Sequence, residues 1–333
     1  MTLLAKNDKI FLTGHKGLVG SAFKKEIEKT IISKKSNWSL ITEDRENLDL
    51  RKKDEVENFF ESQKPDVVII AAAKVGGINA NSKNNSLFLL ENLQIQNNLI
   101  QTSFETGVQR LLFLGSSCIY PKHAQQPFKE ESLLNGILEP TNEGYALAKI
   151  CGLKLCQFLR VEHNFDAISV MPPNLYGPND NFSKNNGHVI PGLLRKFHEA
   201  KVFDHEMVKC WGSGKPRREF MYVEDLVKCC IYLLESWNPK EFNSSSRDLS
   251  FINIGTGEDI SIYDLAYLIK KIVGYQGKII WDKSMPDGSN QKLLDVERLK
   301  DIGWIHSTQL KDGLQKTYQA FLKDYDSNSM RDL

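Results

Sequence analysis

Residues 9–29 read KIFLTGHKGLVGSAFKKEIEK, and this stretch decides the fold. Its first six residues are mostly apolar and predict a buried strand, while the last thirteen carry apolar side chains at helical spacing. Between strand and helix, Gly14, Gly17 and Gly20 form a GxxGxxG pattern. Glycines at such a turn let the backbone approach a pyrophosphate, which then lies at the positive end of the helix dipole. The stretch therefore predicts a strand, a dinucleotide-binding loop and a helix.

The units that follow repeat the alternation of strand and helix. In residues 66–73, DVVIIAAA, every residue after Asp66 is apolar, as in a strand of a parallel sheet that is covered on both faces. We therefore predict an α/β fold of the Rossmann type, a doubly wound parallel sheet. Its further strands are expected at 38–42, 110–117 and 167–178, and its helices at 51–63, 86–107 and 140–160.

The regular alternation ends after Gly177, where a polar segment rich in turn residues begins. We predict a dinucleotide-binding domain at 1–175, with a return segment near 220–250. A smaller substrate-binding lobe is expected from residues 176–219 and 251–325. Helical spacing in the later chain predicts helices at 189–200, 223–236, 261–274 and 310–325.

The composition bounds the class of protein. The chain has 333 residues, of which 41% are hydrophobic, so it can build a full core. Lys and Arg number 43 against 42 for Asp and Glu, which argues against a nucleic-acid binder or a membrane-surface protein. We find no secretory pattern at the N-terminus, no apolar run long enough to cross a bilayer and no CxxC pair among the six cysteines. A cytoplasmic protein with reduced thiols, no metal site and no membrane partner is therefore expected.

Charged residues near the predicted second strand bear on the phosphate state of the dinucleotide. An acidic residue at the end of that strand favours NAD, and a basic residue favours NADP. Residues 40–47, LITEDREN, offer Glu43, Asp44 and Arg45 together, and Lys16 lies inside the glycine loop. Because Lys16 and Arg45 can together neutralise a 2′-phosphate, we predict NADP, in its reduced form NADPH, as the cofactor.

Tyr145 and Lys149 stand four residues apart in the predicted helix at 140–160, so they share one face. A nearby ammonium group stabilises a tyrosinate, so we expect the pKa of Tyr145 to be lowered toward neutrality. Tyr145 can then give its proton to a carbonyl oxygen while a hydride arrives at the carbon. Thr141 is the expected N-cap of this helix. The pair predicts a reductase.

Residues 114–121, LGSSCIYP, follow a predicted strand, and strand ends of such a sheet border the ligand crevice. Ser116 is expected to hydrogen-bond a substrate carbonyl beside the tyrosine. Reduction needs no thiol, but a thiolate at Cys118 can act as the base for an acidic carbon next to a ketone. A second group could return the proton from the opposite face and invert the centre, and His188 is the best candidate among the seven histidines.

With these residues assembled, the chain resembles the GDP-L-fucose synthase family of extended short-chain dehydrogenases/reductases. Members of that family act as 3,5-epimerase and 4-reductase on GDP-4-keto-6-deoxy-mannose. The resemblance covers nearly the whole chain. It is carried by the segments GHKGLVGSA, AAAKVGGI, LLFLGSSCIYPK, EPTNEGYALAKI, NLYGPNDNF, HVIP, WGSGKPRREF and PDGSNQKLLDV.

The resemblance implies roles for particular residues and partners. Ser116, Tyr145 and Lys149 would form a reductive triad that works with NADPH, and Cys118 and His188 would perform epimerisation. A homodimer is implied, formed through long helices beside the catalytic one. The implied cofactor contacts are Gly14, Lys16, Gly17, Leu18, Val19, Gly20, Arg45, Ala72, Lys149 and His188, and the implied GDP-sugar contacts are Lys196, Trp211, Arg218 and Asp287.

Two positions depart from the family's usual pattern and leave alternatives open. Gly144 stands where proline is common, which is expected to loosen the start of the catalytic helix, and Pro173 stands where threonine is usual. Relatives that reduce a GDP-4-keto-6-deoxy-heptose share most of these motifs. A 4-reductase of such a sugar, with or without epimerisation, for bacterial surface polysaccharide therefore remains an alternative.

Two other functions are disfavoured. A 4,6-dehydratase usually carries Thr-Asp-Glu where this chain has Ser-Ser-Cys at 116–118. A non-catalytic dinucleotide-binding regulator usually loses the tyrosine or the lysine of the catalytic pair, and both are present here.

Overall fold

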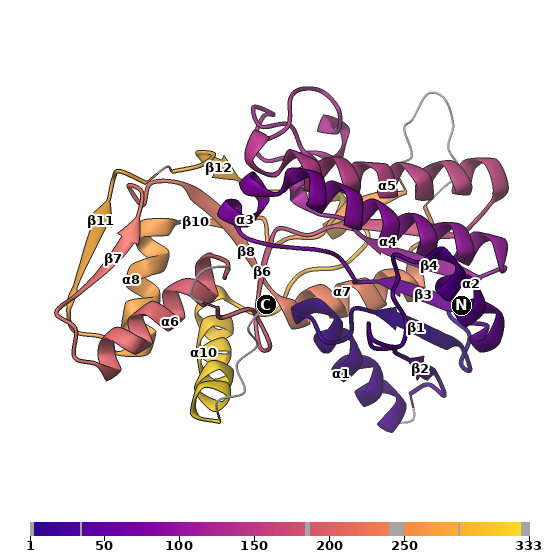
Figure 1. The fold of residues 1–333 in the computed structure, drawn as a ribbon, viewed down its shortest axis with the longest axis horizontal. Coiled ribbons are helices and arrows are strands. Elements are labelled where there is room, and N and C mark those ends of the chain that lie inside the picture. Colours follow the sequence, from indigo (N-terminus) through magenta and orange to yellow (C-terminus); the bar gives the residue numbers. More distant parts are fainter. Residues whose placement is uncertain (1–2, 34, 184–186, 240–249, 286, 328–333) are drawn as a thin grey trace.

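The computed structural model describes residues 3–33, 35–183, 187–239, 250–285 and 287–327. Its larger part is built around a parallel six-stranded sheet (Figure 1). The strand order is β2-β1-β3-β4-β5-β9, and all neighbours run parallel. The predicted doubly wound α/β fold is confirmed. The strands are β1 (Lys9–Thr13), β2 (Ser39–Ile41), β3 (Val67–Ile70), β4 (Arg110–Leu114), β5 (Ala167–Met171) and β9 (Phe251–Asn253).

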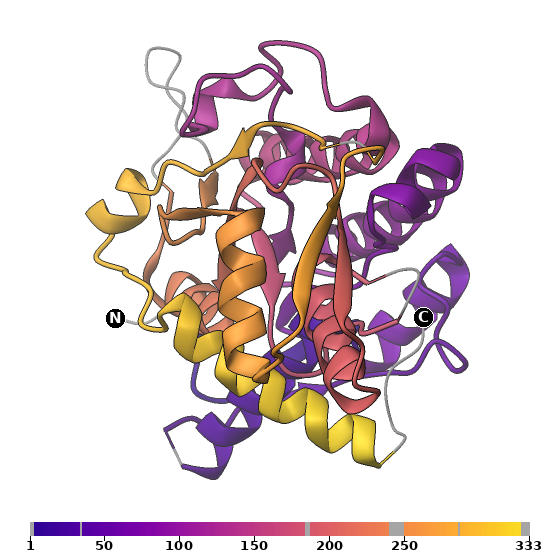
Figure 2. The same ribbon diagram turned by 90° about the vertical axis from the view of Figure 1, so that its left-hand side faces the viewer.

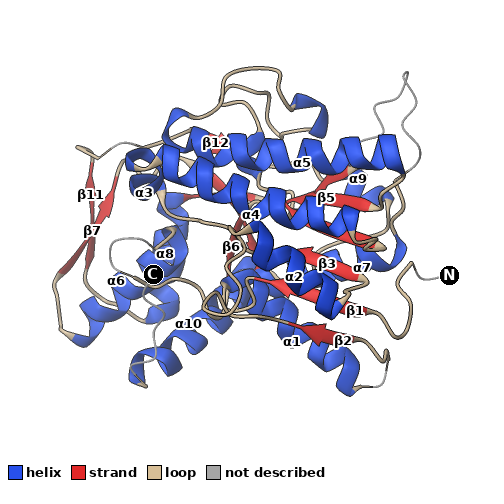
Figure 3. Cartoon of the chain, turned by 45° about the vertical axis from the view of Figure 1, so that its right-hand side comes forward, coloured by secondary structure: helices blue, strands red, loops and turns tan. Residues whose placement is uncertain are grey.

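Helices cover both faces of this sheet, as Figure 3 shows. Because strand side chains alternate between the faces, Ile10 packs with the helices of one layer and Phe11 with those of the other. This double cover explains why β3 is apolar at every position. One layer holds α1 (Leu18–Ile32) and α7 (Val223–Ser236), and the other holds α2 (Lys53–Gln63), α4 (Asn85–Glu105) and α5 (Glu143–His163).

The order of the strands reverses between β1 and β3. The chain passes from β1 to β2 on one side and then returns to place β3 on the other side of β1. In open α/β sheets, ligands bind at the carboxyl ends of the strands beside such a reversal. The glycine loop after β1 and the segment after β3 therefore border the expected ligand crevice.

A second group of elements lies to the left in Figure 1 and faces the viewer in Figure 2. Its core joins side chains of three helices, for example Leu194, Leu265 and Phe321. The helices are α6 (Val189–Val202), α8 (Ile262–Val273) and α10 (Leu310–Asp326). The strands are β6 (Asn174–Tyr176), β8 (Arg217–Tyr222), β10 (Asp259–Ser261) and β12 (Gln291–Lys292) in one sheet and β7 (Met207–Trp211) and β11 (Lys278–Asp282) in another.

The chain crosses between these two parts more than once. After β8 it supplies α7 to the main sheet, and β9 adds the sixth strand just beyond the return segment that the sequence predicts near 220–250. Residues 240–249 of that segment lie outside the described residues. The exact lobe boundaries therefore stay a prediction. In the described part of the chain, no helix has both the length and the apolar character that crossing a membrane requires.

Candidate active site

The glycine loop brings β1 and α1 together with unusual closeness. Gly14 has a φ of +70°, in the left-handed region that favours glycine, and a Cβ there would lie 2.8 Å from the Cα of Ala72 beyond β3. A Cβ on Gly20 would lie 2.1 Å from the Gly14 carbonyl oxygen. The amide of Ala72 donates to Thr13 Oγ1 at 3.2 Å. Glycine is thus required at both positions, because backbone fills the space that a side chain would need.

The start of α1 fits the pyrophosphate of a dinucleotide. Gly17 is the N-cap, and no side chain caps the helix. The amides of Leu18, Val19 and Gly20 in the first turn therefore lack a side-chain acceptor and lie at the positive end of a 15-residue helix. Such a terminus binds anions well. The individual cofactor contacts expected for these residues stay predictions.

The charged residues near β2 are arranged in a way that the sequence did not reveal. Lys16 Nζ lies 2.7 Å from Asp44 Oδ1, and His15 Nε2 lies 3.3 Å from the same oxygen. The hydrogen bond from Lys16 lowers the pKa of Asp44. Arg45 is exposed. Lys16, the glycine-loop cation that is predicted to bind a 2′-phosphate, is therefore paired with the carboxylate of Asp44.

Three of the expected catalytic groups meet where β4 ends. Ser116 is the N-cap of a short 3-10 helix, Ser117–Ile119, and its hydroxyl accepts the amide of Cys118 at 3.2 Å. The same hydroxyl hydrogen-bonds the phenol of Tyr145, which α5 supplies. The Cys118 side chain acts electrostatically on that phenol. The strand exit and the helix thus form one site.

The environment of Tyr145 and Lys149 differs from the expectation. Burial raises the pKa of Tyr145, the charge of Cys118 raises it further, and the hydrogen bond to Ser116 opposes the shift. Lys149 is only 3% exposed, donates to the Leu114 carbonyl at 2.8 Å, and has its pKa lowered by burial to about 8. Its Nζ lies 5.8 Å from the centroid of the Tyr145 ring. The predicted lowering of the tyrosine pKa is wrong here because desolvation disfavours both charged forms.

Cys118 is partly buried, and polar groups from two other elements act on it. The amide Nδ2 of Asn142 donates to Cys118 Sγ at 3.1 Å. The guanidinium of Arg218 on β8 interacts electrostatically with Cys118 and with Glu139, while burial lowers the pKa of Arg218. Sequence reasoning missed Asn142. Its position three residues before Tyr145 was the one available signal.

The predicted N-cap of the catalytic helix is wrong. Thr141 lies inside a short 3-10 helix, Pro140–Asn142, which the Glu139 carboxylate caps by accepting the Thr141 amide. α5 begins at Glu143, and its N-cap residue is Asn142, whose side chain makes no capping hydrogen bond. The Asn142 side-chain amide is therefore available to donate its hydrogen bond to Cys118 Sγ.

His188 lies at the start of α6, where it is the N-cap residue. The side chain is exposed, and desolvation lowers the pKa of its imidazole. This shift favours the neutral imidazole. The role of His188 in proton transfer stays a prediction.

The expected substrate contacts fall into two groups. Lys196 Nζ lies 5.3 Å from the centroid of the Trp211 ring, which is 58% exposed. Asp287 accepts the amide of Ser213 at 2.6 Å, close to that tryptophan in the chain, and the Ser213 hydroxyl at 2.7 Å. These three predicted residues therefore lie on the smaller part of the molecule, near the loop after β7.

Arg218, the fourth predicted contact, lies with the expected catalytic groups. Neighbouring side chains of a strand point to opposite faces, so Arg217 binds Asp259 at 2.7 Å while Arg218 faces Cys118. The loop that carries Asp287 approaches the same place, since Ser289 Oγ donates to Glu139 Oε2 at 3.1 Å. These contacts bring residues of the smaller part of the molecule next to Cys118 and to the segment that precedes α5.

Comparison with known proteins gives consistent results. Residues 10–244 match the model of the NAD dependent epimerase/dehydratase family. The chain is 49% identical over 319 residues to GDP-L-fucose synthase 1 of Arabidopsis thaliana, covering 96% of this chain and 94% of the relative. A GDP-6-OMe-4-keto-L-xylo-heptose reductase from C. jejuni superposes with a TM-score of 0.89 at 33% identity, covering 96% of this chain and 99% of that one. A GDP-L-fucose synthetase from Naegleria fowleri bound to NADP has a TM-score of 0.84 at 27% identity, with 97% of each chain covered.

Proposed function

Because the chain belongs to the NAD dependent epimerase/dehydratase family and, within it, to the GDP-L-fucose synthases, we propose that it converts GDP-4-keto-6-deoxy-mannose to GDP-L-fucose with NADPH. It is an NADP-dependent oxidoreductase that also epimerises its substrate. The observation that carries the proposal is the meeting of Ser116, Cys118 and Tyr145 at the end of β4. One site thus holds a proton donor for a carbonyl oxygen and a thiol for the neighbouring carbons.

Reduction uses the partly buried phenol of Tyr145 as an acid. NADPH, when bound, supplies the hydride that reaches carbon 4 of the sugar. Tyr145 gives its proton to the carbonyl oxygen as the C=O π bond breaks, and its raised pKa keeps the phenol protonated until that moment. Ser116, which already hydrogen-bonds the phenol, holds the same oxygen in place. Lys149 fixes the end of β4 through the Leu114 carbonyl and supplies positive charge beside the phenol.

Epimerisation uses Cys118 and His188 on the carbons that flank the ketone. The Cys118 thiolate removes a proton from carbon, and the electron pair moves to the carbonyl oxygen to give an enolate. Reprotonation of the carbon from the opposite face by His188 inverts the centre. Because desolvation lowers the pKa of His188, this residue first takes up a proton, which its exposed position allows it to draw from water. Solvent hydrogen therefore enters the product.

The substrate's diphosphate and base are assigned to the groups that surround the crevice. Arg218 is a cation that faces the catalytic thiol, and Lys196 lies over Trp211, so charge and an aromatic surface are available together. Asp287 is already bound to Ser213, which fixes its carboxylate for a hydroxyl or an N–H group. A heptose-type GDP-4-keto sugar is the second candidate substrate, favoured by the likeness to the C. jejuni heptose reductase.

We propose that the enzyme uses NADP rather than NAD. Lys16 and Arg45 can meet a 2′-phosphate, and a structurally similar synthetase was solved with NADP. Asp44 opposes that phosphate. We place the enzyme in the cytoplasm and in polysaccharide biosynthesis, because a catalytic thiol needs a reducing compartment and all six cysteines are free.

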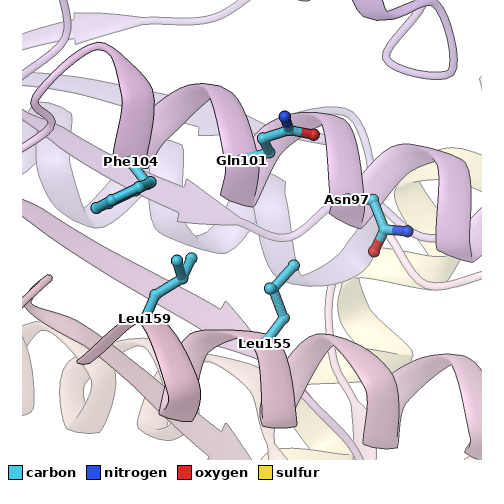
Figure 4. Close-up of a pocket in the computed structure, with 5 residues that line it drawn as sticks. All are labelled: Asn97, Gln101, Phe104, Leu155 and Leu159. Atoms are coloured by element: carbon cyan, nitrogen blue, oxygen red, sulfur yellow. The ribbon is translucent and has the colours of Figure 1, made fainter. Parts of the chain in front are cut away.

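A homodimer is proposed through α4 and α5. On α5, Leu147, Phe158 and Val161 are exposed to 38%, 55% and 51%. With Cys151 and Leu155 between them they form an apolar stripe at helical spacing along the whole helix. Beside it lies a groove lined by Leu155 and Leu159 of α5 and by Phe104, Gln101 and Asn97 of α4 (Figure 4). A second copy related by a two-fold axis would cover the stripe with its own.

Turnover in deuterated water tests the proposal. The fucose route predicts deuterium at both carbon 3 and carbon 5 and a product of L-galacto configuration. Reduction without deuterium incorporation would remove the epimerase half and leave a plain 4-reductase. Bound NADPH without turnover of any GDP-4-keto-6-deoxy sugar would favour a non-catalytic regulator. Parallel assays with hexose and heptose substrates separate the two candidate sugars.

A further inference from the structure

The side chain of Asn142 makes a contact that the roles assigned above do not use. Its Nδ2 donates to Cys118 Sγ at 3.1 Å across a separation of 24 residues. Its Oδ1 is buried and has no hydrogen-bond partner among the described residues. Buried polar atoms without partners are uncommon in folded proteins, so each requires an explanation. Asn142 caps no helix with this side chain, so a helix-capping role does not supply one.

We propose that Asn142 is a further catalytic residue of the epimerisation half of the site, an inference that rests on the proposed function. Its Nδ2 hydrogen-bonds the sulfur of Cys118 and stabilises the thiolate that removes the proton. Its Oδ1 accepts a hydrogen bond from a hydroxyl of the bound sugar. One carboxamide thus sets the base and the substrate at a fixed distance from each other.

The orientation of the carboxamide follows from the chemistry of the sulfur. A thiolate accepts hydrogen bonds, so the amide N–H must face Sγ and the carbonyl oxygen must face away. The reversed amide would place an oxygen lone pair against the sulfur and leave an N–H buried without an acceptor. A neutral amide also keeps its donor at every pH, whereas a histidine or lysine at this place would exchange protons with the thiol.

The other groups that act on Cys118 have different tasks. Arg218 of β8 carries a positive charge that acts at longer range and has Glu139 as a second partner. Tyr145 of α5 stays a neutral phenol because burial raises its pKa, so it brings no charge to the sulfur. Asn142 is the group with a direct hydrogen bond to the sulfur among the described residues. It lies at the N-cap of the helix that carries Tyr145, so one helix start positions both the base and the acid.

Alkylation of the free enzyme tests the contact without any substrate. Cys118 is partly buried, Cys151 is exposed and the other four cysteines are buried, so a Cys151→Ser background leaves Cys118 as the most accessible thiol. The rate of iodoacetamide addition is measured against pH for this background and with Asn142→Ala, with mass spectrometry to identify the modified peptide. The pH midpoint is the readout, because a change of accessibility alters the plateau and not the midpoint.

We expect Asn142→Ala to move the midpoint upward by about one pH unit, and so to slow alkylation at neutral pH about tenfold. Asn142→Asp, which has nearly the same shape but puts a carboxylate beside the sulfur, should move it further. Asn84→Ala is the matched control, because that exposed amide donates only to the Ala80 carbonyl. Midpoints that coincide in all variants would overturn the proposal.

Turnover in deuterated water tests the catalytic consequence. Asn142→Ala should lower deuterium incorporation by about tenfold or more while hydride transfer from NADPH changes by less than about threefold. Equal losses of both would mark Asn142 as structural and overturn the proposal. If the unmodified enzyme itself incorporates no deuterium, the proposed epimerase function fails, and the alkylation midpoints alone decide whether Asn142 stabilises the thiolate.

Discussion

The amide of Gly144 donates a hydrogen bond to Asn85 Oδ1 at 3.0 Å, and a Cβ at position 144 would lie only 2.3 Å from the Asn85 carbonyl oxygen. The first residue of α4 is therefore locked against the first turn of α5, immediately before Tyr145. The expectation that glycine loosens this helix start is wrong. The glycine permits a close contact with Asn85 immediately before Tyr145, and a proline would lack the N–H that makes the hydrogen bond.

Gly144→Ala should destabilise the protein by about 1–3 kcal/mol, because the added methyl group overlaps the Asn85 carbonyl. Gly144→Pro should have a larger effect, since it also removes the hydrogen bond to Asn85. Denaturant unfolding and kcat measure the two consequences. Gly192→Ala within α6 is the control: nothing lies within 4 Å of its would-be Cβ, so alanine there should be neutral or stabilising. Equal changes in the free energy of unfolding for Gly144→Ala and Gly192→Ala would contradict a close contact between Gly144 and Asn85.

Cys118→Ser should abolish deuterium incorporation at carbons 3 and 5 while NADPH oxidation continues, because a serine hydroxyl is too weak an acid to act as the base. The product should then be a reduced sugar with unchanged configuration at both carbons. Mass spectrometry and NMR of the product read the outcome. Tyr145→Phe is the reciprocal variant: reduction should fall about 100-fold or more while exchange persists. Parallel loss of both activities in either variant would argue against separate roles.

Lys149 makes the stability of the fold depend on pH. Burial lowers the pKa of Lys149 to about 8. Below about pH 8 the folded protein therefore buries a charged ammonium, and the full desolvation cost reduces its stability. As the pH rises above about 8 the folded lysine loses its proton while the unfolded one keeps it, so stability should rise by about 2 kcal/mol up to about pH 9.5. Lys149→Met should lack this rise. Denaturant unfolding of both proteins at several pH values compares the slopes, and identical slopes would refute the assignment.

The pairing of Lys16 with Asp44 should reduce the preference for NADPH over NADH. Asp44→Asn frees the lysine and removes a negative charge, so the ratio of KM for NADH to KM for NADPH should rise about threefold. Lys16→Ala should weaken NADPH binding about tenfold and leave NADH nearly unchanged. Lys29→Ala, an exposed lysine paired with Glu26 on the same helix, is the control. Equal effects on both cofactors would show that Lys16 does not meet the 2′-phosphate.

Phe158→Asp should convert the proposed dimer to a monomer, because it would bury a charge within the apolar stripe of α5. Sedimentation or light scattering at several protein concentrations measures the change. Phe203→Asp is the matched control, since that phenylalanine is 61% exposed at the far end of α6. A wild-type protein that is monomeric at high concentration would exclude the interface.

The sequence by itself determined the glycine loop, the parallel sheet and the placement of Tyr145 and Lys149 on one helix. These depend on residues close together in the chain: glycines three apart between a strand and a helix, an apolar run in β3, and Tyr145 four residues before Lys149 on one helix face. The short strands β8, β10 and β12 were missed. These short segments are strands because they pair with one another in the folded chain. β8 begins with two arginines, which do not suggest a strand.

Tertiary structure decided the rest of the site. Asn142 beside Cys118, Asn85 beside Gly144 and Lys16 beside Asp44 are contacts between segments that the sequence separates. The raised pKa of Tyr145 and the lowered pKa of Lys149 likewise come from packing, because desolvation depends on all the atoms around a group and not on its neighbours in the chain. Local spacing specifies which chemical groups are present, and only the folded chain sets their distances and their exposure to water.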